Sequence, residues 1–414
     1  MMKTRISLFR RKRVYLDYAA SAPISETAAR AESDTARAYA GNPNSFHKEG
    51  VNARAALEAA RAEAARFFSA NPDEVIFTSG GTEANNLALF GACAAAQSAE
   101  GGEKSGRHIA VSAVEHPSVL EAARELERRG VRVSFVPVSE EGVVSPKAVR
   151  ELVGDETILV SVMYVQNEVG AIQPVREIAR EVRRARRKRK SVYPLFHIDA
   201  CQAAGFFDLH AARLGADLIS VSGRKIGGPR GAGVLFRRRG TPLSPILFGG
   251  GQEGGMRAGT ENVPAAAGMA AAMREAAAAR ERAAGELAEL RADFIAALEK
   301  QFPDCVIHAK ESGAPHILST TFPECESEEL ALRLDARGIA ASTGSACKSS
   351  EGAVSYVLSA MYGEKFPEGA VRFSFGKETN ERDISRALAA LRHTVPLCRA
   401  EKRSSGRESG EMEK

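Results

Sequence analysis

The chain has 414 residues, of which 44% are hydrophobic and 26% are charged, and its formal net charge is +5. This balance is ordinary for a soluble globular protein, and the length suffices for two domains. The six cysteines are scattered without CxxC spacing, which argues against a zinc site and a disulfide framework, so we expect no bound metal.

Apolar runs in the chain are too short to cross a bilayer. The stretch from Ala265 to Met273 stops at Arg274, well below the roughly 20 residues that a spanning helix needs. Near the start, the apolar stretch from Ile6 to Phe9 is too short for the core of a signal peptide. We therefore expect a cytoplasmic protein.

The first segment with a chemical signature runs from Val75 to Asn86 and predicts a strand, a glycine turn and the start of a helix. Thr82 would then present its hydroxyl and its backbone N–H at a helix N-terminus, which suits a phosphate. The alternative is an ordinary N-capped helix. Strand-like and helical runs continue to alternate as far as Val221, which predicts a mainly parallel sheet flanked by helices.

Two further segments in this alternating region carry a carboxylate and an amine. A strand-like run from Val192 to Ile198 leads to Asp199, and the apolar stretch from Ala216 to Val221 leads to Ser222-Gly223-Arg224-Lys225 and a glycine-rich turn. By itself, the second segment also fits a surface turn. Taken with Thr82, the two segments suit pyridoxal phosphate: Lys225 as the Schiff-base amine and Asp199 as the partner of the pyridine nitrogen. All three residues would lie at the carboxyl ends of strands, where ligands of such sheets bind.

The remaining third of the chain predicts a long helix and a smaller α+β unit. The alanine-rich stretch from Ala265 to Lys300 predicts the helix. The strands expected after it are Cys305 to His308, His316 to Phe322 and Ala370 to Phe375, and the helices are Glu326 to Ala336 and Glu381 to Val395. The polar tail from residue 401 to residue 414 predicts disorder.

Several ordered motifs resemble one family. They are Tyr15-Leu16-Asp17-Tyr18-Ala19-Ala20-Ser21-Ala22-Pro23, Gly41-Asn42-Pro43-Asn44-Ser45-Phe46-His47, Gln166-Asn167-Glu168-Val169-Gly170, Gly249-Gly250-Gly251-Gln252-Glu253 and Arg257-Ala258-Gly259-Thr260-Glu261-Asn262. In this order they resemble the cysteine desulfurases of the NifS/IscS type, in the class V aminotransferase group of fold-type-I pyridoxal phosphate enzymes. The resemblance extends from about Val14 to Leu397. It implies an α/β fold with a seven-stranded, mainly parallel sheet in a large domain and a smaller α+β C-terminal domain.

The resemblance also implies a role for each site residue. Lys225 would hold the cofactor and then act as general base, and Asp199 would hold the pyridinium. His116 would stack over the ring, although a histidine bonded locally at a helix start is the alternative. The further cofactor residues implied are Gly81, Thr82, Asn167, Gln202, Ser222, Arg224 and, from the other subunit of a homodimer, Thr260, with Asn167 also orienting the substrate.

The segment that distinguishes a desulfurase from its transaminase relatives is Ser342-Thr343-Gly344-Ser345-Ala346-Cys347-Lys348. Cys347 is the expected nucleophile that takes the sulfur, since a small polar loop exposes a thiol and Lys348 favours its thiolate. Arg372 alternates with apolar residues in a strand-like run, and the family assigns such an arginine to the substrate carboxylate. A structural ion pair is the alternative for Arg372.

These inferences define an expected activity. The enzyme would remove sulfur from L-cysteine, leaving L-alanine and a persulfide on Cys347 for an acceptor in iron-sulfur cluster assembly or tRNA thiolation. The alternatives are a selenocysteine lyase or an aminotransferase of the same fold and, from another class, a non-catalytic scaffold. The expected units are an N-terminal segment of residues 1–27 packing with the small domain, a large domain of residues 28–264, a small domain of residues 265–400 and the tail.

Three positions depart from the family pattern, and two clusters are strongly basic. Arg224 stands where the family usually has histidine, Gly254 where it commonly has arginine, and Lys377 where it often has arginine. The basic clusters are residues 10–13 and 183–190. A solvated face is the simpler interpretation of each cluster, and a surface for tRNA or an acidic sulfur acceptor is the alternative.

Overall fold

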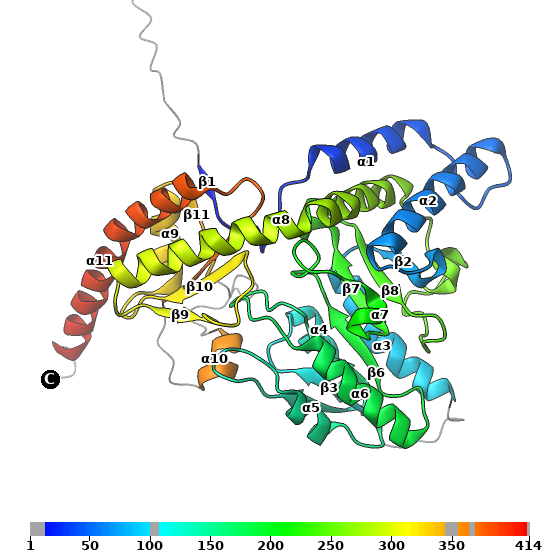
Figure 1. Cartoon of the computed structure of the whole chain (residues 1–414), viewed down its shortest axis with the longest axis horizontal. Helices are drawn as coiled ribbons and strands as arrows, with labels where there is room; N and C mark the ends of the chain where they lie inside the picture. Colours follow the sequence, from blue (N-terminus) through cyan, green and yellow to red (C-terminus); the bar gives the residue numbers. More distant parts are fainter. Residues whose placement is uncertain (1–12, 100–106, 344–354, 364–368, 412–414) are drawn as a thin grey trace, which may run out of the picture.

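A seven-stranded sheet forms the centre of the larger part of the molecule (Figure 1). The computed structural model describes residues 13–99, 107–343, 355–363 and 369–411. The strands are β2 (Val75–Thr78), β3 (His108–Ser112), β4 (Arg132–Val136), β5 (Thr157–Ser161), β6 (Leu195–Asp199), β7 (Leu218–Ser222) and β8 (Gly233–Arg237), in the spatial order β2-β8-β7-β6-β5-β3-β4. Strand β8 runs opposite to the other six strands of this sheet, which all share one direction. The predicted sheet is thereby confirmed.

Helices cover both faces of this sheet. Helices α3 (Gly81–Ala99) and α4 (Pro117–Arg128) pack on one face. The other face is covered by α2 (Lys48–Phe67), α5 (Pro146–Leu152), α6 (Val175–Arg189), α7 (Ala211–Leu214) and the first part of α8 (Val263–Gln301). The central strands are buried on both sides and are mostly apolar, and the few polar side chains within them, such as His197, Ser161 and Ser220, bond one another. The residues that line the cavity come mainly from the strand ends and the loops that follow them.

The smaller part of the molecule has a core of its own. Its sheet has the order β12-β10-β9, with all pairs antiparallel, and a separate parallel pair joins β1 to β11. The elements are β1 (Val14–Tyr15), β9 (Val306–His308), β10 (Ile317–Thr321), α9 (Ser327–Ala336), β11 (Ile339–Ala340), α10 (Tyr356–Tyr362), β12 (Ala370–Ser374) and α11 (Glu381–Glu411). Leu16, Phe294 and Phe373 are fully buried together there. The start of the chain thus packs with its end.

Helix α8 connects the two parts and runs across the upper middle of Figure 1, from beside α11 to beside α1. It begins at a cap, where the side chain of Asn262 accepts the Ala265 N–H at 3.1 Å. Met269 lies in the core of the larger part and Phe294 in that of the smaller part. Helix α1 (Glu26–Ala38) packs along α8. A single rigid element therefore sets how the two parts meet.

Helix α11 continues through most of the segment for which composition predicted disorder. It extends from Glu381 to Glu411, and its first turns bury Ile384, Leu388 and Leu391 against the smaller core. Glutamate, lysine and arginine beyond this anchor are good helix formers, so the helix propagates once it has been nucleated. The boundaries at residues 28, 265 and 401 stay predictions.

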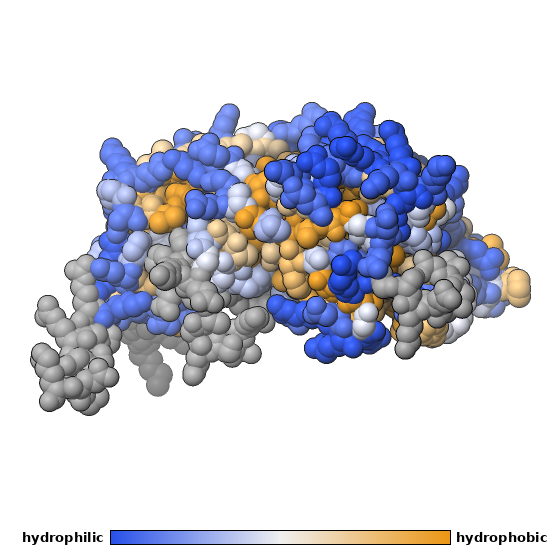
Figure 2. All heavy atoms as spheres, turned by 90° about the horizontal axis from the view of Figure 1, so that it is seen from below, coloured by the Kyte–Doolittle hydropathy of each residue, from blue (hydrophilic) through white to orange (hydrophobic). Residues whose placement is uncertain are grey.

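The surface carries both polar and apolar areas. Figure 2 shows hydrophilic residues along much of the outline of one face and hydrophobic residues toward its middle. Among the described residues, no helix combines the length with the apolar character that crossing a membrane requires.

The basic end of α6 is partly used inside the protein. Arg186 pairs with the buried carboxylate of Asp217, and its Nε donates to the carbonyl oxygen of Pro194 at 2.7 Å. Arg189 donates to the carbonyl oxygen of Thr157 at 2.6 Å. These two cations hold the helix to the sheet, so they contribute less to a landing surface than the sequence alone indicates.

Candidate active site

A cavity of about 350 Å³ lies at the carboxyl ends of the sheet strands, next to the smaller part. It is lined by every predicted cofactor and substrate residue except Thr260: Gly81, Thr82, His116, Asn167, Asp199, Gln202, Ser222, Arg224, Lys225 and Arg372. Most of them follow β2, β3, β5, β6 and β7, which run in one direction. Arg372 comes from β12 of the smaller part.

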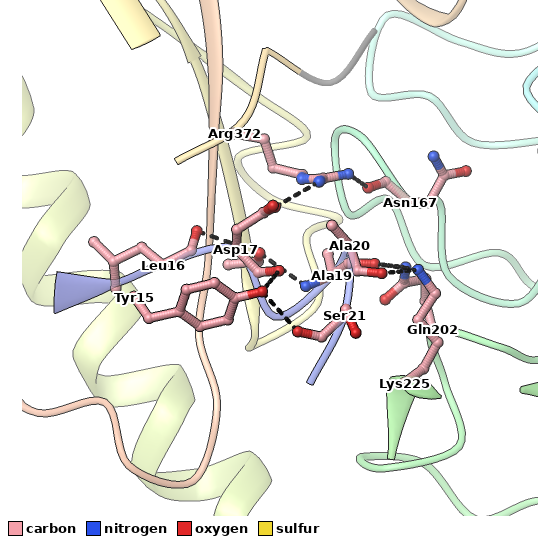
Figure 3. Close-up of polar contacts among 11 residues, drawn as sticks. Tyr15, Leu16, Asp17, Ala19, Ala20, Ser21, Asn167, Gln202, Lys225 and Arg372 are labelled. Atoms are coloured by element: carbon pink, nitrogen blue, oxygen red, sulfur yellow. Dashed lines mark hydrogen bonds and ion pairs between the residues drawn. The ribbon is translucent and has the colours of Figure 1, made fainter. Parts of the chain in front are cut away.

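Lys225 ends a short 3-10 turn, η2 (Gly223–Lys225), directly after β7. Its Nζ donates to the carbonyl oxygens of Ala19 and Ala20, the latter at 2.9 Å, and Gln202 donates to the Ala19 oxygen at 2.9 Å (Figure 3). Burial, followed by the neighbouring Arg224 charge, lowers the pKa of Lys225 to about 8. A much larger fraction of this amine is neutral at physiological pH than for an exposed lysine.

Asp199 is the last residue of β6 and is only 4% exposed. Its Oδ1 accepts the Cys201 N–H at 2.9 Å and its Oδ2 accepts an N–H of Asn85 at 2.7 Å. Hydrogen bonds of this kind support a charged carboxylate in a buried place. The side chain is thus held where it can meet a cationic ring nitrogen.

The N-terminus of α3 offers bare backbone to the same cavity. A Cβ placed on Gly81 would lie 2.6 Å from the Sγ of Cys201, so only glycine fits there. The hydroxyls of Thr82 and Ser222 and the guanidinium of Arg224 line the cavity as well. Free N–H groups at a helix N-terminus beside hydroxyls and a cation suit a phosphate.

His116 is the N-cap of α4 and lines the cavity at the same time. Its Nδ1 accepts the backbone N–H of Ser118 at 3.1 Å. The sequence left two alternatives for His116, a local bond at the helix start or a place in the site. The side chain makes the local bond and also lines the cavity. Burial lowers its pKa, opposed by Asp199 and reinforced by Lys225 and Arg224.

Arg372 joins the two parts of the molecule across the cavity. One Nη donates to the carbonyl oxygen of Asn167 at 2.7 Å and the other to Oδ1 of Asp17 at 2.9 Å (Figure 3). The Nε of Arg372 has no hydrogen-bond partner within the described part of the chain. The ion pair that the sequence left as an alternative is therefore present, on a guanidinium that also lines the cavity.

With this geometry in view, comparisons with known proteins give a consistent answer. The family model described as aminotransferase class-V matches residues 14–387. This chain belongs to that family. It is similar to a cysteine desulfurase IscS of Dictyoglomus turgidum, with 37% identity over 94% of this chain and 96% of the relative. It is also 36% identical to cysteine desulfurase IscS 1 of Archaeoglobus fulgidus, over 93% of this chain and 98% of the relative.

Solved structures agree with the sequence relatives. A NifS-like protein superposes with a TM-score of 0.84 and 34% identity, over 93% of this chain and all of the other. A NifS-like protein of Rickettsia africae gives a TM-score of 0.79 and 26% identity, over 93% and 99% of the two chains. The predicted family and fold class are confirmed.

One predicted site residue lies apart from the cavity, and another falls outside the described residues. Thr260 is exposed and does not line the cavity. Cys347 lies outside the described residues.

The structure also accounts for two of the departures from the family pattern. Gly254 has a φ of +63°, next to Glu253, whose buried carboxylate pairs with Arg61 at 2.6 Å. Lys377 pairs with Glu275 at 3.0 Å.

Sequence reasoning missed three residues that hold the site. Asn85 donates to Asp199, and Ser118 is hydrogen-bonded to His116. Asp17 accepts a hydrogen bond from Arg372. Asn85 lies three residues after Thr82 in one helix, and that spacing, which puts both on one face, was the available signal. The distance in sequence between Asp17 and Arg372 left no such signal.

Proposed function

We propose that this protein is a cysteine desulfurase, which moves the sulfur of L-cysteine to its own Cys347 and releases L-alanine. The observation that supports this most is one cavity holding a depressed-pKa lysine, a bonded carboxylate and an arginine from the second core. The curated relatives named cysteine desulfurase align over more than nine tenths of the chain. In the net reaction, the substrate Cβ–S bond breaks, an S–S bond forms on Cys347, and Cβ takes a proton.

The residues present fit pyridoxal phosphate. Lys225 would hold its aldehyde carbon and Asp199 its ring nitrogen. The bare backbone at Gly81, with Thr82 and Ser222 beside it, would hold its phosphate. When bound, this group supplies an electron sink for the substrate carbon. Cofactor identity and these roles are part of the proposal.

The amine of Lys225 is suited to proton transfer. A pKa of about 8 puts a substantial fraction of the amine in the neutral form at pH 7 to 8, and only that form removes a proton. To reach a ligand, the amine leaves the carbonyl oxygens of Ala19 and Ala20, which Gln202 also contacts. These carbonyl groups hold the amine at the mouth of the cavity until a ligand replaces them.

Arg372 and Asn167 would orient the substrate. A guanidinium recognises a carboxylate through paired N–H donors, and that of Arg372 lies at the cavity wall. The Oδ1 of Asn167 is buried without a hydrogen-bond partner within the described residues. It is available to accept a hydrogen bond from a bound ligand.

The other cysteines are poorly suited to the nucleophilic role. Burial raises the pKa of every cysteine thiol that the structure describes: Cys93, Cys201, Cys305, Cys325 and Cys398. Cys201 is the instructive case, because it lines the cavity and yet the Asp199 charge raises its pKa further. A thiol kept protonated is a weak nucleophile, which favours Cys347.

A homodimer would complete the site. Thr260 is exposed, and the neighbouring loops expose large apolar side chains, with Phe46 at 96% and Phe248 at 83%. Such residues are costly to leave in water and mark an interface. We propose that Thr260 reaches the phosphate of the partner subunit. Light scattering should give twice the chain mass, and a fully active monomer would contradict this arrangement.

The wider setting is proposed from the sequence. The sulfur acceptor would be an iron-sulfur scaffold or a tRNA-thiolation enzyme, and the location cytoplasmic. The N-terminal segment, the large domain and the small domain keep their expected boundaries at residues 28 and 265. Persulfide trapping with candidate acceptors would identify the pathway.

The activity is tested with the full chain, pyridoxal phosphate and L-cysteine. We expect sulfide in the presence of a thiol reductant, with alanine in equal amount. Cys347→Ser should abolish both while keeping the absorbance of bound cofactor, and Cys201→Ser is the matched control that should stay active. Elemental selenium or selenide release from selenocysteine alone would favour a lyase, and a chain that stays colourless with the cofactor would favour a scaffold.

A further inference from the structure

A line of four hydrogen-bonded side chains connects the carboxylate of Asp199 to the imidazole of His116. Asn85 Nδ2 lies 2.7 Å from Asp199 Oδ2 and 2.9 Å from Ser118 Oγ. Ser118 Oγ lies 2.8 Å from His116 Nδ1. Asn85 is 1% exposed, so water does not compete for its amide. The proposed roles of Asp199 and His116 say nothing about Asn85 and Ser118.

The amide of Asn85 fixes which groups donate and which accept along this line. An ionised carboxylate only accepts, so the amide nitrogen of Asn85 faces Asp199 and gives its other hydrogen to Ser118 Oγ. The hydroxyl hydrogen of Ser118 is then free for His116 Nδ1. The backbone N–H of Ser118, which can only donate, also points at Nδ1 from 3.1 Å. Two donors therefore meet at a nitrogen that must be an acceptor.

We propose that Asn85 and Ser118 are positioning residues that hold His116 as the neutral tautomer carrying its proton on Nε2. In this tautomer the histidine offers an N–H to whatever occupies the cavity. It acts as a hydrogen-bond and proton donor there, and the role of base stays with Lys225. This inference rests on the site of the proposed function, but its test uses neither cofactor nor substrate. The tautomer of His116 can therefore prove wrong while the proposed function holds, and the reverse.

The charges around His116 agree with a neutral ring. Asp199 favours the imidazolium, whereas burial, Lys225 and Arg224 oppose it, and the pKa of His116 is lowered overall. Burial raises the pKa of the adjacent Glu115 well above its usual range, so this carboxyl adds no stabilising charge at neutral pH. A proton added to Nδ1 would also displace the two donors from Ser118.

The test is long-range proton–nitrogen NMR of the full-length chain labelled with nitrogen-15 in histidine, without cofactor, across pH 5 to 8. Signals of His116 are assigned by their loss in His116→Gln. We expect Nδ1 of His116 to show the shift of an unprotonated nitrogen and Nε2 that of a protonated one. A proton on Nδ1 in the wild-type protein at neutral pH would overturn the proposal, whatever the variants do.

Variants test which groups donate the hydrogen bonds between Asp199 and His116. Asn85→Asp places an acceptor where the donor was, so Ser118 turns its hydroxyl toward position 85, and the proton affinity of His116 should rise about tenfold. In Ser118→Ala, a measurable fraction of the Nδ1–H tautomer should appear. Ser118→Thr keeps the hydroxyl and should give the wild-type spectrum. Ser145→Ala is the matched control, because that exposed serine also stands at the N-terminal end of a helix but makes no capping bond.

The same variants separate positioning from mere structure. In the loaded enzyme, Ser118→Ala should shift the pH profile of kcat, whereas Ser145→Ala should leave it in place. If Asn85→Asp and Ser118→Ala both fold and both give the wild-type spectrum, the proposal is also overturned.

Discussion

The two walls of the cavity differ in how ready they are for a ligand. On the sheet wall, Asp199 already accepts two N–H groups and leaves its carboxylate facing the cavity. On the wall of the smaller part, Arg372 already has partners, Asp17 and the carbonyl of Asn167. The sheet wall is organised in advance, and the arginine wall must exchange partners when a carboxylate arrives.

This difference follows from where the residues come from. The sheet wall is made of loops that follow neighbouring parallel strands, so its residues are fixed by one rigid core. The arginine wall is assembled from β12, the β1 segment and the loop after β5, which belong to different parts of the molecule. We therefore expect substitutions in the sheet wall to affect the chemistry, and those in the arginine wall to affect substrate binding.

The largest effect is expected at the sheet wall. Lys225→Ala removes the amine that attaches the cofactor and moves the proton, so desulfurase activity should fall by at least about 10⁴-fold. Sulfide release and the visible absorbance of bound cofactor are the two measurements. Lys310→Ala, which removes an exposed lysine paired with Glu299, is the control and should change neither. Near-normal activity in Lys225→Ala would contradict the assignment of the chemistry to the sheet wall.

Arg372→Lys tests the opposite wall. A lysine keeps the charge but loses the paired donors, so we expect kcat/KM for cysteine to fall about 100-fold, mainly through KM. The absorbance of bound cofactor should stay, because the sheet wall is unchanged. Steady-state kinetics at several cysteine concentrations separate KM from kcat. A loss confined to kcat would mean that Arg372 serves the chemistry and not binding.

The sheet wall is also the part that could be predicted from the sequence. Thr82, Asp199 and Lys225 each follow an apolar run, and parallel strands bring such positions to one edge whatever the loops do. The long helix ahead of Phe302 was predicted within two residues at its start and one at its end, since an alanine-rich amphipathic stretch carries its own signal.

The arginine wall could be predicted only in part. Arg372 was identified through its family resemblance, but its contact with Asp17 joins residues 355 positions apart, and local patterns carry no such information. The same holds for Asn85 with Asp199, 114 positions apart. Helix α11 extends past residue 401, into the segment for which composition predicts disorder, and its anchor on the smaller core is not visible in local composition.

Glu168, in the loop after β5, bonds the N-terminus of α10 and titrates. Its side chain accepts the hydroxyl of Ser355, the N-cap of α10, at 2.5 Å, and burial raises its pKa to about 7. The folded protein therefore holds a proton that the unfolded chain releases between pH 4.5 and 7, so stability falls as the pH rises through this window.

Glu168→Gln removes that titration. The variant should match the wild type near pH 4.5 and be more stable by about 3 kcal/mol above pH 7, from roughly 1.4 kcal/mol per pKa unit. Urea unfolding at both pH values measures the difference. An equal gain or loss at the two pH values would show that this carboxyl does not titrate between pH 4.5 and 7.

The smallest effect is expected at Asp17, and its sign decides whether the arginine wall exchanges partners. Asp17→Asn removes the charge that occupies Arg372, whose side chain is only 6% exposed, and leaves a buried guanidinium short of a counter-ion. An incoming carboxylate then meets less competition, so KM for cysteine should fall about threefold while kcat changes little. Asp304→Asn, at an ion pair with Arg399 far from the cavity, is the matched control. A rise in KM would instead mean that Asp17 holds Arg372 in the binding position, and the two walls would then be equally organised in advance.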